Sequence, residues 1–178
     1  MTGFRVFDIS EDNFDDLIFD YQLEETSALQ HLLNNKTSVS IDDLRRVALW
    51  KMSRVLNVPD HLLTKLGALA VKHDLTHRDA FSKTLIEELV KSDGIGYPMA
   101  STILKFLRPD IFPIIDVRAY RALNGERIYQ AKYSYELYMV YIDKLLEIAN
   151  KKDLPLNKID EYLYAFDKKH NVKINQPK

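Results

Sequence analysis

With 178 residues, of which 46% are hydrophobic and 29% charged, the chain has the balance of one globular domain or of two small lobes that share a core. The formal net charge of −1 excludes a globally basic nucleic-acid binder, although it is compatible with a local basic face. The absence of cysteine excludes disulfides, thiol nucleophiles, zinc–thiolate sites and iron–sulfur clusters. The sequence shows neither a signal-peptide pattern nor a long apolar run, so we expect a soluble, cytoplasmic protein without a membrane partner.

The first part of the chain carries helical periodicity and little strand-like alternation. Residues 4–9 leave two readings open, an extended strand or a segment that covers the core. A serine followed by acidic residues predicts a helix over 13–25, and a second helical pattern follows at 27–35. A third helix is predicted over 40–56, where Ser40 is the N-cap candidate and acidic residues occupy the first turn.

The rest of the chain is also helical in pattern, with prolines between the helices. Pro59 ends the helix before it, and Pro109 and Pro113 interrupt the chain between two later helices. Helical patterns fall at 61–73, 77–92, 97–107, 116–125, 133–152 and 157–170. About eight helices with short connections predict an all-α, bundle-like fold.

A short glycine-containing turn separates the helices predicted at 77–92 and 97–107. Gly94 and Gly96 allow positive φ angles and close approach of another group to the backbone. Successive N–H groups at the start of the second helix can bind a phosphate, and Pro98 fits an early helical position. Taken alone, the turn is much better explained as a plain connection between two helices.

The wider stretch makes the turn more specific. "DGIGYPMAS" followed by "LRPDIFPIID" resembles the helix-hairpin-helix motif of the HhH-GPD DNA glycosylase superfamily, in which a hairpin leads through a Gly/Pro-rich loop to an aspartate that opens the next helix. Asp116 follows Gly96 by 20 residues, which is the spacing typical of that family. The match covers residues 85–123, with the hairpin motif at 85–107 and the aspartate-bearing loop and helix at 108–124.

The resemblance implies a single two-lobed helical unit over residues 1–178 and the activity of a monofunctional DNA glycosylase. In such an enzyme the Asp116 carboxylate stabilises the positive charge that develops on deoxyribose as the N-glycosidic bond breaks. The alternative is that Asp116 only caps the helix that follows it, and the two roles are compatible. Pro98 stands where bifunctional members carry a nucleophilic lysine, which excludes lyase chemistry from that position, and Asp93 replaces the usual proline.

The resemblance also implies double-stranded DNA as the partner, held by hairpin amides and nearby side chains. The candidate DNA-binding residues are Gly94, Ile95, Gly96, Tyr97, Lys105, Arg118 and Arg121. For any single basic residue among them, a solvent-exposed pair on a helix surface is the alternative. No cofactor is expected beyond, at most, a monovalent cation at the hairpin, and an iron–sulfur cluster is excluded.

Aromatic and histidine residues supply the remaining candidates. Trp50 and Lys51 are candidates for a base pocket, with Lys51 able to supply an amine if it faces Asp116, although ordinary packing of Trp50 is the favoured reading. Tyrosines recur at three-residue steps from 135 to 141, and we expect their rings in the core and their hydroxyls at the surface rather than stacked on bases. His73 and His77 have a helical spacing but no evident third ligand, so no metal site is expected.

Two other functions remain open at this point. One is a non-catalytic helix-hairpin-helix module that binds DNA without a base pocket. The other is a helical protein that binds a protein partner and uses the hairpin only for packing. The sequence identifies neither the base nor the oligomeric state.

Overall fold

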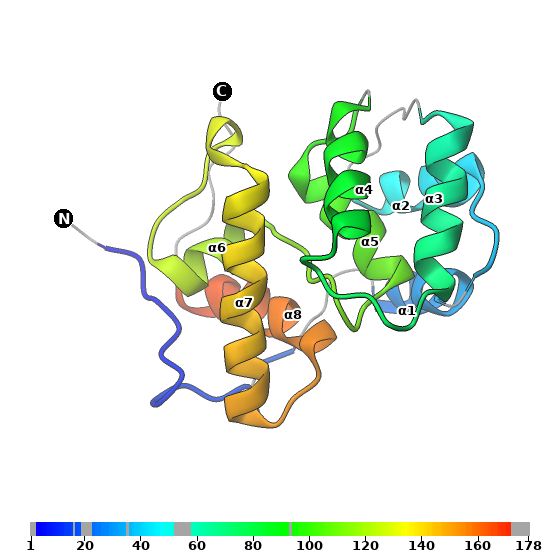
Figure 1. The fold of residues 1–178 in the computed structure, drawn as a ribbon. Coiled ribbons are helices and arrows are strands. Elements are labelled where there is room, and N and C mark those ends of the chain that lie inside the picture. Colours follow the sequence, from blue (N-terminus) through cyan, green and yellow to red (C-terminus); the bar gives the residue numbers. More distant parts are fainter. Residues whose placement is uncertain are drawn as a thin grey trace.

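The structure is a computed structural model that describes residues 3–15, 17–18, 23–34, 36–51, 58–92 and 94–171. Within these residues it contains eight α-helices, one short 3-10 helix and no strand, which confirms the predicted all-α class (Figure 1). The helices are α1 (Leu23–Leu33), α2 (Ile41–Lys51), α3 (Asp60–Val71), α4 (Ala80–Lys91), α5 (Tyr97–Leu107), α6 (Val117–Asn124), α7 (Tyr135–Lys152) and α8 (Leu156–His170), with the 3-10 turn η1 at Gln130–Lys132.

The helices gather into two groups in space (Figure 1). The first group contains α1 to α5, and the second contains α6, α7 and α8. Within the first group α5 packs against α1, α2, α3 and α4, and within the second α8 packs against α6 and α7. The segment 108–116 carries the chain from the first group to the second.

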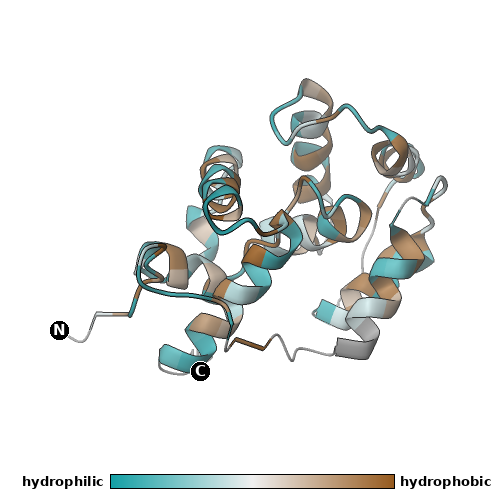
Figure 2. Ribbon diagram, turned by 90° about the horizontal axis from the view of Figure 1, so that it is seen from below, coloured by the Kyte–Doolittle hydropathy of each residue, from teal (hydrophilic) through white to brown (hydrophobic). Residues whose placement is uncertain are grey.

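The central helix α5 has the most continuous burial, because it is surrounded by four other helices. All residues from Met99 to Leu107 are buried, including Ser101, Thr102 and Lys105. The other helices are amphipathic, and Figure 2 shows hydrophobic stripes along one side of them with hydrophilic residues opposite. None of the helices in the described part of the chain has the length and apolar character that a membrane span requires.

The N-terminal segment differs from its prediction. Residues 13–15 and 17–18 are not helical, and the first described helix begins only at Leu23. Phe14 instead stacks on Phe7 at a centroid distance of 4.9 Å and on Tyr162 at 4.4 Å, so aromatic packing against α8 determines the path of this segment. Of the two readings for residues 4–9, the structure shows the covering segment.

Capping residues define both ends of α6, the helix that follows the loop after α5. Asp116 is the N-cap of α6, with extended backbone angles of φ −122° and ψ 159°. Gly125 ends the helix in the left-handed region at φ 72°. A Cβ atom at Gly125 would lie 2.6 Å from Val6 Cγ2, so the N-terminal segment closes tightly over this end of α6. Only part of the helix predicted over 40–56 can be compared, because residues 52–57 lie outside the described residues.

Candidate functional site

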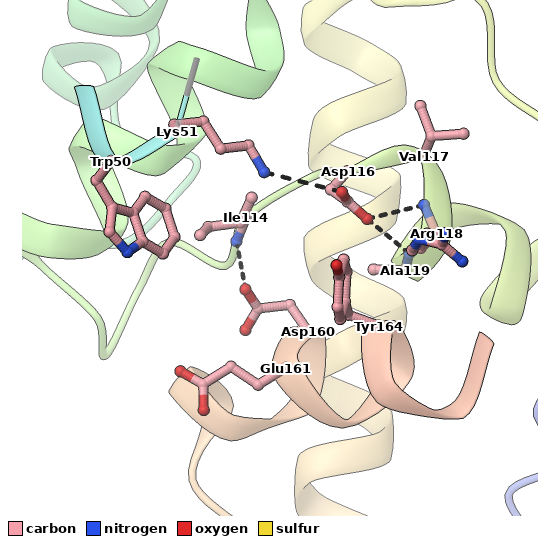
Figure 3. A pocket seen from close by; sticks show the side chains of 10 residues that line it. All are labelled: Trp50, Lys51, Ile114, Asp116, Val117, Arg118, Ala119, Asp160, Glu161 and Tyr164. Atoms are coloured by element: carbon pink, nitrogen blue, oxygen red, sulfur yellow. Dashed lines mark hydrogen bonds and ion pairs between the residues drawn. The ribbon is translucent and has the colours of Figure 1, made fainter. Parts of the chain in front are cut away.

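A cavity of about 280 Å³ lies between the two groups of helices, where the end of α2 faces the start of α6 and the second turn of α8 (Figure 3). Its lining residues are Trp50, Lys51, Ile114, Asp116, Val117, Arg118, Ala119, Asp160, Glu161 and Tyr164. The structure therefore brings three of the candidates from the sequence, Trp50, Lys51 and Asp116, to one pocket. Arg118, a fourth candidate, is also on its wall.

Asp116 uses its two carboxylate oxygens differently. Oδ1 accepts hydrogen bonds from the backbone N–H groups of Arg118 at 2.8 Å and Ala119 at 3.0 Å, which is the geometry of a helix N-cap. Oδ2 lies 3.8 Å from Nζ of Lys51. Both side chains are partly accessible, at 20% for Asp116 and 17% for Lys51. One oxygen is thus fixed by the helix while the other is available to the cavity (Figure 3).

Two buried tyrosines hold the loop that precedes Asp116. The Tyr138 hydroxyl donates to the Pro113 carbonyl and the Tyr141 hydroxyl donates to the Ile114 carbonyl, each at 2.9 Å. The expectation of surface hydroxyls was wrong for these two residues, because both are fully enclosed and satisfy loop carbonyls instead. Burial raises the pKa of both phenols well above the usual value, which keeps them neutral and able to donate.

The same loop is held from two further helices. The Ile114 N–H donates to Asp160 Oδ2 at 3.0 Å, and the Ile115 N–H donates to Ser101 Oγ at 3.1 Å. Helices α5, α7 and α8 therefore all bond to the three residues before Asp116. Because its supports are rigid elements, the Asp116 carboxylate is positioned before any ligand binds.

A buried ion cluster joins α5 to α8 beneath the cavity. Lys105 Nζ lies 2.8 and 2.9 Å from the two oxygens of Asp160 and 3.0 Å from Glu161 Oε1. Burial raises the pKa of Asp160, and the positive charge of Lys105 acts in the opposite direction. Because only 3% of the Lys105 side chain is exposed, it cannot reach a bound duplex as the sequence-based prediction required.

The two predicted arginines differ in accessibility. Arg121 is 1% exposed and makes two bonds to Asp167, at 2.6 and 2.7 Å. Arg118 bonds to the same carboxylate at 3.0 Å, but 20% of its side chain is exposed and it lines the cavity. Arg121 is therefore a structural cation in this fold, and Arg118 is the one of the two that can contact a ligand.

Trp50 combines packing with a place on the pocket wall. Its indole N–H donates to Thr26 Oγ1 at 3.0 Å, and its ring meets Phe106 edge to face at a centroid distance of 5.2 Å. Only 6% of the residue is exposed. The favoured reading of Trp50 as a packing residue fits these contacts, and the exposed edge of its ring adds an apolar surface to the cavity.

The two glycines of the hairpin differ in backbone conformation. Gly94 has φ 79°, a value that favours glycine, whereas Gly96 at φ −99° is the extended N-cap of α5. No described side chain caps the start of α5, so the N–H groups of its first turn remain available to a ligand, apart from position 98, where proline has none. Ile95, which is 4% exposed, anchors the turn in the core, so its side chain contacts the protein and only its backbone can meet DNA.

Tyr133 connects the hairpin to Asp116. Its ring is stacked on that of Tyr97 at 6.3 Å with an interplanar angle of 9°. Burial, and after it the nearby charge of Asp116, raises the pKa of Tyr133. Its buried hydroxyl has no hydrogen-bond partner within the described residues. Since Tyr97 follows Gly96 directly, Tyr133 contacts a residue of the hairpin and also lies close enough to Asp116 to feel its charge.

Three lining residues, Asp160, Glu161 and Tyr164, were missed in the sequence, and all come from α8. The available signal was the spacing of Asp160, Leu163 and Asp167 at steps of three and four on one apolar helix face. Acidic residues on such a face require buried cationic partners, but the sequence does not say which cations they meet.

The arrangement offers a carboxylate, an amine and apolar walls in one small cavity. Within the described residues no group of three or more His, Asp or Glu side chains is placed to hold a metal ion. His77, one of the two histidines considered for metal binding, instead lies 2.8 Å from Asp143 on α7. Comparisons with protein families, with curated proteins and with solved structures found no match to this chain.

Proposed function

We propose that the protein is a DNA glycosylase-like enzyme that hydrolyses the N-glycosidic bond of a damaged or mismatched base without hairpin-lysine lyase chemistry. The observation that carries the proposal is the position of Asp116 on the wall of a cavity between two groups of helices, close to Tyr133, which is stacked on Tyr97 beside the Gly94–Gly96 hairpin. The arrangement of the helices in two groups supports the proposal, because the HhH-GPD resemblance implies two lobes.

Asp116 supplies the chemistry in this proposal. As the bond to the base breaks, positive charge develops on the deoxyribose, and a carboxylate beside the anomeric carbon stabilises that charge. Oδ1 is held by two backbone N–H groups, while Oδ2 faces the cavity and can also orient the attacking water. Hydrogen bonds join the loop to α5, α7 and α8 and hold the Asp116 carboxylate in place. The carboxylate therefore does not have to be ordered during the reaction.

The cavity receives the extruded base. Its volume of about 280 Å³ is near the lower end of the range of about 300–1,000 Å³ for small-molecule pockets. Trp50, Ile114 and Val117 offer apolar surface to the faces of a base, and the partly exposed guanidinium of Arg118 can bond to its edge. These side chains do not indicate which base the cavity binds.

The hairpin and its neighbours hold the DNA backbone. The uncapped N–H groups at the start of α5 face a phosphate, and the partly exposed Tyr97 lies beside them, while Arg118 is a partly exposed cation on the cavity wall. Lys105 and Arg121 have no part in this contact because both are buried in ion pairs. Their role is to hold α5 and α6 against α8.

A non-catalytic DNA-binding module is the second candidate. It is favoured by the fact that Asp116 already has two partners, the α6 amides and the Lys51 ammonium, and so has a structural role of its own. In that case the hairpin would bind duplex DNA and the cavity would remain without a base.

A lesion-panel assay separates the two candidates. Duplexes that contain uracil, oxidised purines, alkylated purines or single mismatches are incubated with the wild-type protein and with an Asp116→Asn variant. The proposal predicts base release from at least one duplex by the wild type and its loss in the variant, with duplex binding retained. Binding without any base release by the wild type would support the non-catalytic module.

A further inference from the structure

A groove of about 300 Å³ lies between α6 and α7, away from the cavity that contains Asp116. Among the described residues, the groove and the cavity have no lining residue in common. Both α6 and α7 pack against α8, and Figure 1 shows α7 in front of α8, on the near side of its group. The groove is therefore a separate concave surface that the proposed function does not use.

The centre of the groove is apolar. The rings of Tyr120 and Tyr141 are stacked at a centroid distance of 6.4 Å, and Tyr141, which is only 2% exposed, lies at the base of the groove. Leu137 is partly exposed beside them, and 52% of Val140 is exposed. A single exposed valine is ordinary, but one that continues into an apolar groove favours a surface that a partner covers.

Opposite charges lie at equal distances on either side of Val140. Glu136 is about one helical turn before it and Lys144 about one turn after it, and all three residues line the groove. Both charged side chains are exposed. Lys144 Nζ donates to Asn124 Oδ1 at 2.7 Å, and this neutral oxygen does not compensate the charge of the lysine. When the helix is turned end for end about Val140, each charge falls opposite a charge of the other sign.

We propose that the groove is the interface of a homodimer, in which the α7 helices of two copies pack antiparallel across a two-fold axis at Val140. In a two-fold interface the same patch occurs on both subunits, so every contact between unlike residues is made twice. Glu136 of each subunit faces Lys144 of the other, and the two valines meet over the apolar centre. Because the charge pattern is complementary to itself, a second copy of this chain is the partner that fits it. The inference does not depend on any activity toward DNA.

The absence of cysteine from the chain permits a direct test by disulfide formation. Val140→Cys puts one thiol in each chain at the proposed axis, where the two Cβ atoms would come within the range of about 3.5–4.5 Å that a disulfide requires. Leu49→Cys is the matched control, because Leu49 is an apolar residue with 65% exposure on α2, in the other group of helices. After mild oxidation, we expect at least about ten times more linked dimer with Val140→Cys than with Leu49→Cys.

Reversal of the charges tests the antiparallel pairing without a cross-link. Sedimentation equilibrium of the full-length wild type should give the mass of two chains. Glu136→Lys and Lys144→Glu should each raise the dissociation constant of the dimer at least about tenfold, because two attractive contacts become repulsive. The double variant restores opposite charges across the axis, so its dissociation constant should return to within about threefold of the wild-type value. Circular dichroism checks that each variant keeps its helices.

Three results would overturn the dimer. The first is a wild type that stays monomeric at about 100 µM, since interfaces of ordinary size bind at micromolar concentrations or below. The second is an equal yield of linked dimer from Val140→Cys and Leu49→Cys, which decides the question even where a charge variant folds poorly. The third is a double variant that dimerises as weakly as the single reversals. None of these measurements involves DNA, so they can fail or succeed independently of the lesion-panel assay.

Discussion

The carboxylate of Asp160 accepts a hydrogen bond from the Ile114 N–H at 3.0 Å, two residues before Asp116. The same carboxylate receives both bonds of an ion pair from Lys105, so α5, α8 and the loop that leads to Asp116 meet at one buried group. The placement of the candidate catalytic residue therefore depends on an ion cluster that it does not touch.

Replacing Asp160 with asparagine should destabilise the fold strongly. The amide can still accept the Ile114 N–H, but Lys105 then keeps only Glu161 as an anionic partner in an enclosed site. Removal of one partner from a buried pair costs about 3–5 kcal/mol, and because Glu161 remains we expect about 3 kcal/mol. Urea unfolding followed by circular dichroism measures this difference.

The control for that variant is Asp42→Asn, which removes an equally charged group from an exposed pair with Arg45. Side-chain exposure of 75% for Asp42 means that water screens the pair, so its loss should change stability little. Equal unfolding free energies for Asp160→Asn and Asp42→Asn would show that the buried cluster does not hold the fold in the way described.

Helix boundaries could be predicted from the sequence where it has clear capping residues or prolines. The helix expected over 97–107 is α5, and the Asp116 and Gly125 signals gave the start and end of α6. The prediction was wrong at residues 13–15 and 17–18, where a serine followed by acidic residues was read as the start of a helix. There Phe14 lies against Tyr162, 148 positions later in the chain, and such distant packing is not visible in a local window.

The candidate site was predictable only in part. Asp116 was identified by its spacing from the hairpin, and Trp50 and Lys51 were named as lining residues before their proximity to Asp116 was known. Lys105 and Arg121 were placed on the DNA because charge is read from the sequence but burial is not. Their acidic partners lie on α8, more than 40 residues away in the chain, so only the fold could pair them.

Helix α2 ends in Trp50 and Lys51 and carries Asp43 in its first turn. Its contribution to the stability of the fold should fall in acid because of Asp43. Burial opposes ionisation of Asp43, but hydrogen bonds from Lys36 and from the Ser40 N–H and hydroxyl outweigh it and hold the pKa of Asp43 below its usual value of 3.8. A lowered folded-state pKa adds stability above the unfolded value, and that stability is lost as the pH falls through the folded value.

The measurement for Asp43 is the difference in unfolding free energy between the wild type and Asp43→Asn. This difference should be constant near neutral pH and should begin to shrink below about pH 4, where Asp43 takes up a proton in the unfolded chain, and the loss is complete only below the lowered folded-state pKa. A difference that stays the same from about pH 6 to about pH 3 would mean that ionised Asp43 does not stabilise the helix.

The hairpin proposal predicts a specific effect of charge at Gly96. Its φ of −99° suits any residue, and an added Cβ would meet only Pro98 Cδ at 3.8 Å, so Gly96→Glu should fold normally. The new carboxylate would repel a phosphate at the start of α5, and we expect the dissociation constant for duplex DNA to rise about tenfold at low salt. Fluorescence anisotropy at two salt concentrations measures the change.

Gly3→Glu is the matched control for that experiment. It adds the same charge at an exposed position where a Cβ would meet nothing within 4 Å, and Gly3 is not part of the hairpin. Equal affinities of the two variants for duplex DNA would mean that the hairpin does not contact DNA and that only the net charge of the protein affects binding.

The rate of base release by Asp116→Asn, measured under single-turnover conditions on a lesion duplex that the wild type processes, tests the central claim most directly. Asparagine caps a helix about as well as aspartate, so unfolding free energy and duplex affinity should be almost unchanged. Because the amide has no charge to stabilise the developing cation, we expect the rate to fall at least about 100-fold. An Asp116→Asn variant that releases the base at the wild-type rate would contradict the account.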